Sequence, residues 1–198
     1  MAAPFLTTEV VRNMKTYKGS LLISHPNLQV SNPFSRTVIY IYQDHPKQGT
    51  AGIVLNRPAK VTVKEMARES HVIFPDGQTL VHTGGPINPH AITILHSDEW
   101  QSSNTVGAGN GLAISSDEVM LEKISSGNTP IYWRTFSGMC GWLPGQLQAE
   151  LKGTFPYTKE QSWLTVQGDC ATLFDSDGDE QWENCLELSG QRMFDAYF

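Results

Sequence analysis

Charged side chains and cysteines are both scarce in this chain of 198 residues. Only 17% of the residues are charged, and acids outnumber bases by 20 to 14, which gives a formal net charge of -6. Disorder requires few aromatic residues and high net charge, whereas 10% of these residues are aromatic. We therefore expect a folded protein, since a chain of about 200 residues buries roughly 70% of its unfolded surface and commonly forms one domain.

The scarcity of cysteines and of apolar runs restricts where the protein works. Three widely spaced cysteines are an odd number and form no C-x-x-C pair, so neither a disulfide framework nor the usual zinc spacing is present. No apolar run approaches the about 18 residues that cross a membrane. Residues 1–15 lack the apolar region of a secretory signal. We expect a cytoplasmic protein with no membrane contact.

Complete catalytic and nucleotide-binding motifs are also missing. Residues 107–111 have G-x-G-x-G spacing and precede a strand-like segment, which favours a flexible hairpin loop over a phosphate-binding loop. Neither G-x-S-x-G nor H-E-x-x-H occurs. His82, His90 and His96 fall near strand ends and could converge on a metal, but hydrogen-bonded structural histidines are the simpler interpretation. We predict no metal site and no cofactor.

Positive charge is concentrated in the first third of the chain. Residues 1–60 hold seven Lys and Arg against two acids, whereas residues 139–198 hold three against ten. Phosphate binding requires clustered positive charge, so weak nucleic-acid binding through the first third is an alternative function. A solvated face accounts for the same charges, and we do not expect a nucleic-acid partner.

Short strands and a few helices are predicted from the residue pattern. The predicted strands cover residues 20–24, 36–43, 51–56, 80–83, 91–96, 112–115, 131–137 and 171–174, and the predicted helices cover 62–70, 115–126, 144–152 and 179–189. Capping boxes begin the first two helices, at Thr62 and Ser115. Because strands and helices interleave irregularly, we predict one mixed α+β domain over residues 19–198, preceded by an arm or short helix over residues 1–18.

Cys140 is the candidate nucleophile. It lies shortly before a predicted helix, and a helix N-terminus there would lower the pKa of the thiol. A buried residue of small size is the alternative, and we favour it because cysteine often simply packs in the core.

An ordered set of short segments forms the most specific pattern in the sequence. The segments are residues 19–26, 32–38, 52–58, 84–86, 94–96 and 138–146, followed by Glu150, Trp163, Phe174 and Trp182. This set resembles the YqgE/AlgH family of bacterial proteins. Ser31 or Asn32 stands where the family usually has Asp, and Cys140 stands where a small residue such as Ala is usual, which argues against a family-wide role for a thiol.

The resemblance implies an α+β fold in which a mixed, branched β-sheet with a small closed barrel is surrounded by helices. It implies no established enzymatic reaction and no agreed catalytic residues. Some members carry a transcriptional-regulator label from a link to alginate production, without a DNA-binding motif.

The segments of this resemblance also have a physical interpretation. We interpret the glycines, the prolines and the tryptophan as structural hallmark residues: Pro58, Gly84, Gly85, Pro86, Gly138, Gly141 and Trp142. The polar side chains of Asn56, Arg57, His96 and Gln146 are predicted to line one ligand-binding cleft.

The sequence therefore favours a cytoplasmic binding or regulatory protein. Its expected partner is another protein or a small ligand of undefined identity, and it could influence transcription indirectly through protein contacts. The first alternative is an unrecognised enzyme that uses a cleft around His96, Arg57 and Gln146, or the Cys140 thiol. The second is the weak nucleic-acid binder described above.

Overall fold

A computed structural model describes residues 16–66, 79–157, 163–168 and 173–195. Its strands are β1 (Ser20–Ser24), β2 (Val38–His45), β3 (Gly49–Val54), β4 (Pro58–Thr62), β5 (Leu80–Thr83), β6 (Ile87–Ser97), β7 (Val106–Gly109), β8 (Leu112–Ser115), β9 (Trp133–Trp142) and β10 (Trp163–Gln167). Its helices are α2 (Val63–Met66), α3 (Glu118–Ser125), α4 (Gln146–Lys152) and α6 (Gly178–Asp195). The mixed α+β class is confirmed, with the sheet predominating. The predicted N-terminal arm falls largely outside the described residues.

The strands form one branched sheet. Hydrogen-bonded neighbours follow the order β10-β1-β2-β3-β9-β6-β8-β7, and β5 joins β9 from the side while pairing with β4. β5 runs parallel to β9, whereas the other pairs are antiparallel. Residues 135–137 of β9 pair with β5, but residues 140–142 pair with β3. β9 is therefore the branch point of the predicted branched sheet.

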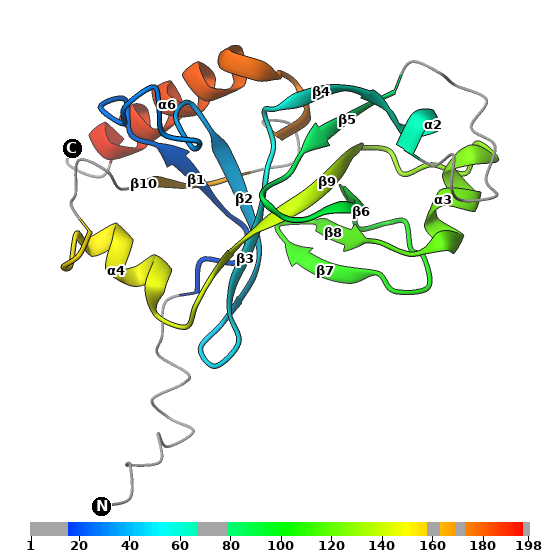
Figure 1. Cartoon of the computed structure of the whole chain (residues 1–198), viewed down its shortest axis with the longest axis horizontal. Helices are drawn as coiled ribbons and strands as arrows, with labels where there is room; N and C mark the ends of the chain where they lie inside the picture. The colour runs from blue at the N-terminus through cyan, green and yellow to red at the C-terminus, as the bar shows by residue number, and fades with distance from the viewer. Residues whose placement is uncertain (1–15, 67–78, 158–162, 169–172, 196–198) are drawn as a thin grey trace, which may run out of the picture.

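The sheet curls into a half-barrel that stays open. β10 and β7 end the path of described strands and do not pair with each other. Figure 1 shows α4 and α6 at one end of the sheet and α2 and α3 at the other. The resemblance implied a closed barrel surrounded by helices, and both expectations are corrected. The barrel is open because no strand pairing joins β10 to β7, and the described helices lie at the two ends of the sheet.

β1 is buried on both faces and so lies at the centre of one end. Successive side chains of a strand point to opposite faces. Leu21 and Ile23 pack in the cluster that includes Trp182 of α6, whereas Leu22 packs in the cluster that includes Leu147 near α4. Each such buried side chain contributes about 1.5–3 kcal/mol. This two-sided burial explains why the segment is continuously apolar at its centre instead of alternating.

Three glycines allow the turn after β5 to cross β9 at the branch point. A Cβ atom on Gly84 would clash with the carbonyl oxygen of Gly138, and one on Gly138 would clash with the carbonyl oxygen of Gly85. Gly138 also has a φ of 73°, which side chains rarely adopt. The Gly84 N–H donates to the carbonyl of Ser137 (2.7 Å), and its own carbonyl accepts from Val54 (2.8 Å). Backbone hydrogen bonds at the crossing thus join β3, β5 and β9.

The β7–β8 hairpin reaches across the open side of the half-barrel. An Asn-Gly pair forms its two-residue turn, with Asn110 at a φ of 54°. The Asn110 Nδ2 donates to the carbonyls of Gly19 (2.7 Å) and Gly168 (2.8 Å). The Tyr40 hydroxyl donates to the carbonyl of Gly109 (2.8 Å). The flexible hairpin loop predicted over residues 107–111 is therefore a strand as far as Gly109, and hydrogen bonds hold the turn that follows in place.

One of the two predicted capping boxes is formed as expected. The Thr62 hydroxyl accepts from the Glu65 N–H (3.2 Å), and the Glu65 carboxylate accepts from the Thr62 N–H (2.9 Å). At the second helix the cap is Asp117 instead of Ser115, and its carboxylate accepts from the Met120 N–H (2.8 Å). Ser115 remains in β8, because strand pairing with β6 extends through it.

The predicted strand over residues 171–174 is wrong where it can be compared. Leu173 and Phe174 are helical, while residues 171–172 lie outside the described part of the chain. β4 and β10 were not predicted. Each depends on a partner distant in sequence, since β10 pairs with β1 and β4 pairs with β5.

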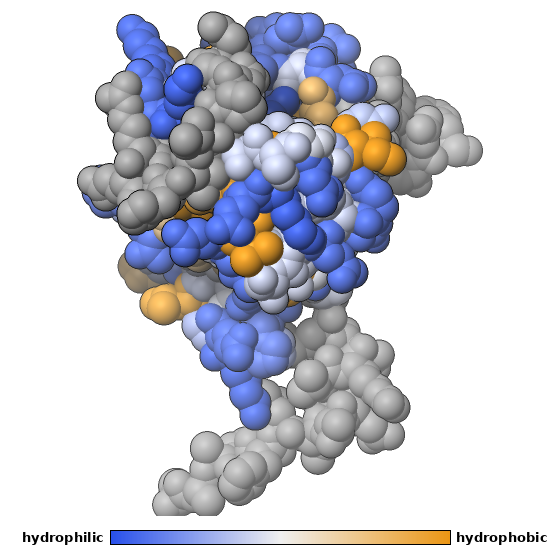
Figure 2. Space-filling view, turned by 90° about the vertical axis from the view of Figure 1, so that its right-hand side faces the viewer, coloured by the Kyte–Doolittle hydropathy of each residue, from blue (hydrophilic) through white to orange (hydrophobic). Residues whose placement is uncertain are grey.

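The surface opposite α4 is largely polar. Figure 2 faces the end that carries α2 and α3, and there hydrophobic residues form small separate patches. None of the helices that the structure describes combines the length and the apolar character needed to cross a bilayer.

We call the Asn110 hydrogen bonds to Gly19 and Gly168 the hairpin clasp, and we expect substitutions of Asn110 to lower stability in a graded way. Asn110→Gly keeps the turn conformation but removes the hydrogen bonds of the side-chain amide, and should lower the free energy of unfolding by about 1–2 kcal/mol. Asn110→Ala adds the strain of a positive φ and should lose about 1 kcal/mol more. Urea denaturation measures both. Wild-type stability in Asn110→Gly would show that the clasp contributes nothing.

Candidate functional site

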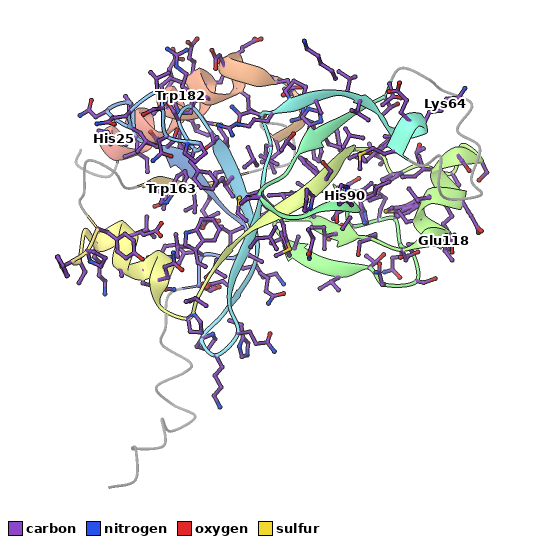
Figure 3. The ribbon with its side chains drawn as sticks, viewed as in Figure 1. His25, Lys64, His90, Glu118, Trp163 and Trp182 are labelled. Atoms are coloured by element: carbon purple, nitrogen blue, oxygen red, sulfur yellow. The ribbon has the colours of Figure 1, made fainter. Side chains whose placement is uncertain are left out.

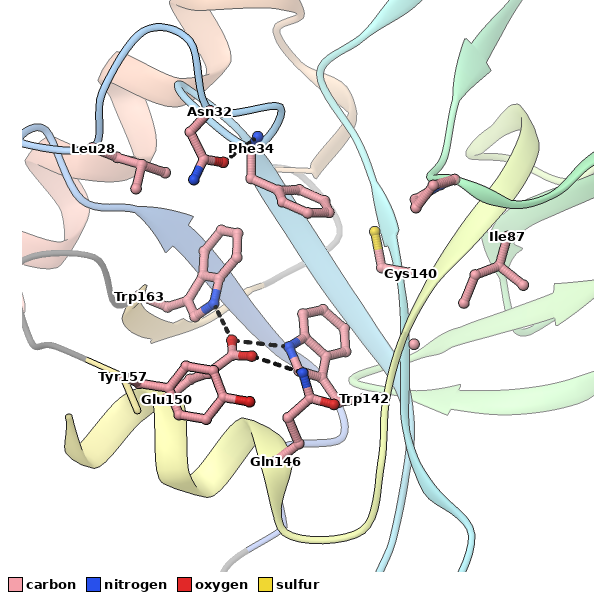
Figure 4. A pocket seen from close by; sticks show the side chains of 12 residues that line it. Leu28, Asn32, Phe34, Ile87, Cys140, Trp142, Gln146, Glu150, Tyr157 and Trp163 are labelled. Atoms are coloured by element: carbon pink, nitrogen blue, oxygen red, sulfur yellow. Dashed lines mark hydrogen bonds between the residues drawn. The ribbon is translucent and has the colours of Figure 1, made fainter. Parts of the chain in front are cut away.

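A cavity of about 370 Å³ lies beside α4, β9 and the loop that joins β1 to β2 (Figure 4). We call it the α4 pocket. Its aromatic lining consists of Phe34, Trp142, Tyr157 and Trp163, and the remaining lining residues are Leu28, Asn32, Pro86, Ile87, Cys140, Gly141, Gln146 and Glu150. The volume falls in the range of about 300–1,000 Å³ that small-molecule sites occupy.

Glu150 is held in the pocket wall by hydrogen bonds from three side chains. The indole N–H groups of Trp142 and Trp163 each donate to its Oε2 at 3.1 Å, and the Gln146 amide donates to its Oε1 at 3.0 Å. The Leu143 N–H donates to the Gln146 Oε1 (3.0 Å), which fixes the amide with its NH₂ group toward Glu150. The carboxylate is therefore oriented before any ligand arrives (Figure 4).

The sequence of α4 explains this arrangement. Residues four apart share a helix face, so Gln146 and Glu150 both face the pocket. Leu147 and Leu151 share the neighbouring face and pack in the core cluster beneath β1–β3. Gly153 ends the helix in the left-handed conformation (φ 63°).

Aromatic rings from separate elements form the pocket walls. The rings of Trp142 and Trp163 have centroids 6.5 Å apart and planes at 81°, and those of Phe34 and Trp163 are 5.9 Å apart at 72°. Both distances lie in the range of about 4.5–7 Å that edge-to-face aromatic pairs prefer. The contacts join β9, β10 and the β1–β2 loop. The walls are thus braced by one another.

Cys140 lines the pocket as a buried thiol. It lies within β9, and its Sγ donates to the carbonyl of Gly84 (3.5 Å). Burial raises the pKa of Cys140 to about 12, although the charge of Arg57 opposes this rise. The predicted lowering of this pKa by a helix N-terminus is wrong, because α4 begins only at Gln146 and a helix dipole acts over its first turn. The thiol is therefore a poor nucleophile at neutral pH.

His96 lies in the core of the other half of the sheet, away from the pocket lining. Its Nδ1 faces the carbonyl of Ser97 (2.9 Å) and must donate to it, so its Nε2 accepts from the Ser115 hydroxyl (2.9 Å). Burial lowers the pKa of His96. The imidazole is fully buried and both of its nitrogens are bonded, which makes it a structural group.

Asn56 joins three backbone segments. Its Oδ1 accepts from the Val38 N–H (2.9 Å), and its Nδ2 donates to the carbonyls of Arg36 and Gly178 (both 2.9 Å). These bonds tie β2 and the loop before it to the start of α6. Asn56 is 4% exposed and does not line the α4 pocket.

Arg57 lies close to the pocket without lining it. It donates to the carbonyl of Ser35 in the β1–β2 loop (3.2 Å), and burial lowers its pKa. Its charge also acts on Cys140, whose pKa it lowers against the effect of burial. Of the four residues predicted to share one cleft, only Gln146 lines the α4 pocket.

The hallmark residues divide between the crossing and the pocket. Gly84, Gly85 and Gly138 form the crossing at β9, and Pro58 begins β4. The others line the pocket: Pro86, Gly141 and Trp142. Trp142 therefore has a polar contact with Glu150 besides its packing.

The three histidines considered for a metal have separate surroundings. His82 Nε2 lies 2.7 Å from the Asp177 carboxylate, and burial lowers the pKa of His82. His90 is exposed, and Figure 3 shows it far from Trp163. In the described residues no three His, Cys, Asp or Glu side chains gather as metal ligands.

Most of the pocket residues were not predicted to form a site. The sequence analysis named Glu150 and Trp163 only as residues that carry the family resemblance. Phe34 was included only as part of the segment 32–38. The usable signal was the spacing of Gln146 and Glu150 on one predicted helix face. The two tryptophans that meet there come from strands distant in sequence.

Buried histidines predict that stability falls in mild acid. Because folding lowers the pKa of His96 below its ordinary 6.5, the unfolded state binds more protons as pH falls through about 6.5, and the free energy of unfolding should drop by up to about 1.4 kcal/mol per pH unit for this histidine. His96→Asn should reduce this slope in urea denaturation and leave the part due to His82. His90→Asn, at an exposed position, is the control and should keep the wild-type dependence of the free energy of unfolding on pH. The same dependence in His96→Asn would show that His96 does not cause the loss of stability in acid.

The buried thiols should resist alkylation in the folded protein. Burial raises the pKa of Cys185 to about 11 and that of Cys140 to about 12, so iodoacetamide at about pH 8 should label both at least about 100-fold more slowly than in concentrated urea. Mass spectrometry of the peptides gives the rates. Equal rates for Cys140 with and without urea would show an accessible thiolate.

Comparison with known proteins places this geometry in a family. A model of the AlgH-like family matches residues 21–193. A UPF0301 protein of Xanthomonas oryzae pv. oryzae is 35% identical over 182 residues, which cover 89% of this chain and 90% of that protein. A UPF0301 protein of Stenotrophomonas maltophilia is 32% identical over 179 residues, which cover 88% and 89%.

Solved structures agree with the sequence relatives. The solution structure of the AlgH protein from Pseudomonas aeruginosa is similar with a TM-score of 0.70 and 29% identity, over 87% of this chain and 90% of that one. A crystal structure of a Corynebacterium diphtheriae protein shares the fold with a TM-score of 0.65 at 19% identity, over 89% and 90%. The chain belongs to the AlgH-like family.

Proposed function

We propose that this protein binds a small ligand in the α4 pocket and acts as a binding or regulatory protein. The observation that carries the proposal is a carboxylate fixed by three N–H donors inside an aromatic-walled cavity of ligand size. Sites for small molecules combine largely apolar walls with a few fixed polar groups. Ordering Glu150 in advance reduces the entropy lost when a ligand binds.

An enzymatic function has less support from the same geometry. Cys140 is protonated at neutral pH, because its pKa is about 12. The two nitrogens of His96 are occupied by Ser97 and Ser115, so the imidazole is not available to a substrate in the α4 pocket. Binding without chemistry uses the pocket as it stands.

Nucleic-acid binding also has less support. Arg36 pairs with Asp179 (2.9 Å) and lies over the ring of Trp182, at 5.3 Å from its centroid. Arg57 donates within the protein to Ser35. These two members of the basic first third are thus engaged by the fold itself, which leaves fewer positive groups for phosphates.

Protein contacts and location complete the proposal. Leu143 and Phe155 flank the two ends of α4 and are 74% and 94% exposed, so a protein contact beside the pocket would use them. Cys140 and Cys185 are free and buried, which supports a reducing compartment such as the cytoplasm. An influence on transcription would then be indirect, through a ligand-dependent protein contact.

Filling the pocket should abolish ligand binding. A collection of metabolites is screened for compounds that raise the melting temperature, since a ligand at about 100 times its Kd adds about 2.7 kcal/mol of stability. Ile87→Trp places a large ring at the pocket rim, where Ile87 is 41% exposed, and should weaken any hit more than tenfold as measured by titration calorimetry.

Ile131→Trp is the matched control, because Ile131 is 74% exposed and does not line the pocket. It should bind the same compounds with wild-type affinity. A screen without hits, or hits that Ile87→Trp binds as well as the wild type, would refute the proposed function.

A further inference from the structure

The α4 pocket contains a negative charge that no neighbouring side chain neutralises. In the described part of the chain, ion pairs within 4.0 Å join Arg36 to Asp179 and His82 to Asp177, and none involves Glu150. No other residue of the lining carries a charged side chain at neutral pH. The described lining therefore carries the charge of one carboxylate.

The Glu150 carboxylate also retains capacity for one more donor. A carboxylate has about four acceptor positions, and the two indoles and the Gln146 amide occupy three of them. Two of these bonds go to Oε2 and one goes to Oε1. An N–H or C–H group of a ligand cation can therefore approach Oε1 without breaking an existing bond.

Aromatic rings surround this charge in the arrangement that favours a cation. Trp163 is nearly perpendicular to both Trp142 and Phe34, at 81° and 72°, so the walls turn a corner instead of forming a flat stack. A cation within about 6 Å of a ring centroid is attracted by the ring quadrupole, most strongly by that of tryptophan. Aromatic cages for quaternary ammonium groups combine such rings in this way.

Arg57 carries a positive charge close to the cavity but does not line it. Arg57 acts electrostatically on Cys140 but donates to the Ser35 carbonyl and is absent from the lining. An anionic ligand would thus meet Glu150 without a compensating cation among the described lining residues, and like charges about 4 Å apart repel even when the surroundings are partly aqueous.

We infer that the α4 pocket binds an organic cation, of the substituted ammonium class, between its aromatic rings and the Glu150 carboxylate. This inference rests on the proposed function and specifies the ligand of the same site. A quaternary or protonated amine gains both the charge attraction and the ring contacts, whereas a neutral molecule of the same shape gains only the contacts.

Three probes of nearly equal shape separate charge from shape. They are choline, its neutral analogue in which a quaternary carbon replaces the nitrogen, and the tert-butylacetate anion. Titration of the full chain, followed by calorimetry and tryptophan fluorescence, should give choline at least about tenfold tighter binding than the neutral analogue, with the anion weakest. This comparison uses only wild-type protein, so it does not depend on the folding of any variant.

Glu150→Gln then tests the residue. It removes the charge with little change in size and should lower choline affinity about tenfold, to that of the neutral analogue, while the affinity of the analogue itself changes less than twofold. Glu122→Gln makes the same change on the exposed surface of α3 and should bind all three probes as the wild type does.

Equal affinity for choline and its neutral analogue would overturn the cation inference and leave the proposed function standing. Tighter binding of the anion, or no binding of choline, would also overturn it. The proposed function fails by a different result, the absence of any pocket-dependent hit in the metabolite screen with Ile87→Trp and Ile131→Trp.

Discussion

The close backbone contact of Gly84 and Gly85 with Gly138 is the constraint on which the rest of the structure depends. A Cβ atom at any of these positions would clash with the backbone, so the turn after β5 can cross β9 only because all three residues are glycine. Past the crossing, the partner of β9 changes from β5 to β3. The exchange carries the end of β9 into the other half of the sheet. Trp142 thereby reaches α4, so the crossing that branches the sheet also places one wall of the pocket.

A short series of hydrogen bonds connects the pocket side chains to this framework and fixes their orientation. The backbone of Leu143, just after β9, orients Gln146, and Gln146 orients Glu150. Glu150 in turn accepts from the indoles of β9 and β10. Each group is held by an element already fixed by packing, because Leu147 anchors α4 in the core beneath β1. The carboxylate is positioned by the fold and does not depend on a flexible loop.

Locally determined features could be predicted from the sequence, whereas features that depend on distant partners could not. The strands at residues 20–24, 80–83 and 112–115 have the predicted bounds, because β-branched and apolar patterns and flanking turns specify them. The open edge of the sheet, the pairing of β10 with β1 and the pKa of Cys140 depend on what packs from elsewhere. The place of Trp163 in the pocket could not be predicted either, because it depends on the pairing of β10 with β1.

The four polar residues predicted to share a cleft show how a functional polar group can be distinguished from a structural one. The hydrogen bonds of Asn56 and His96 go to other protein groups, and neither of these buried side chains lines the α4 pocket. Glu150 differs in two respects, because it lines a cavity and, among the described residues, has no ion-pair partner. The fold therefore orders the pocket, and the carboxylate inside it keeps one acceptor position that no described donor occupies.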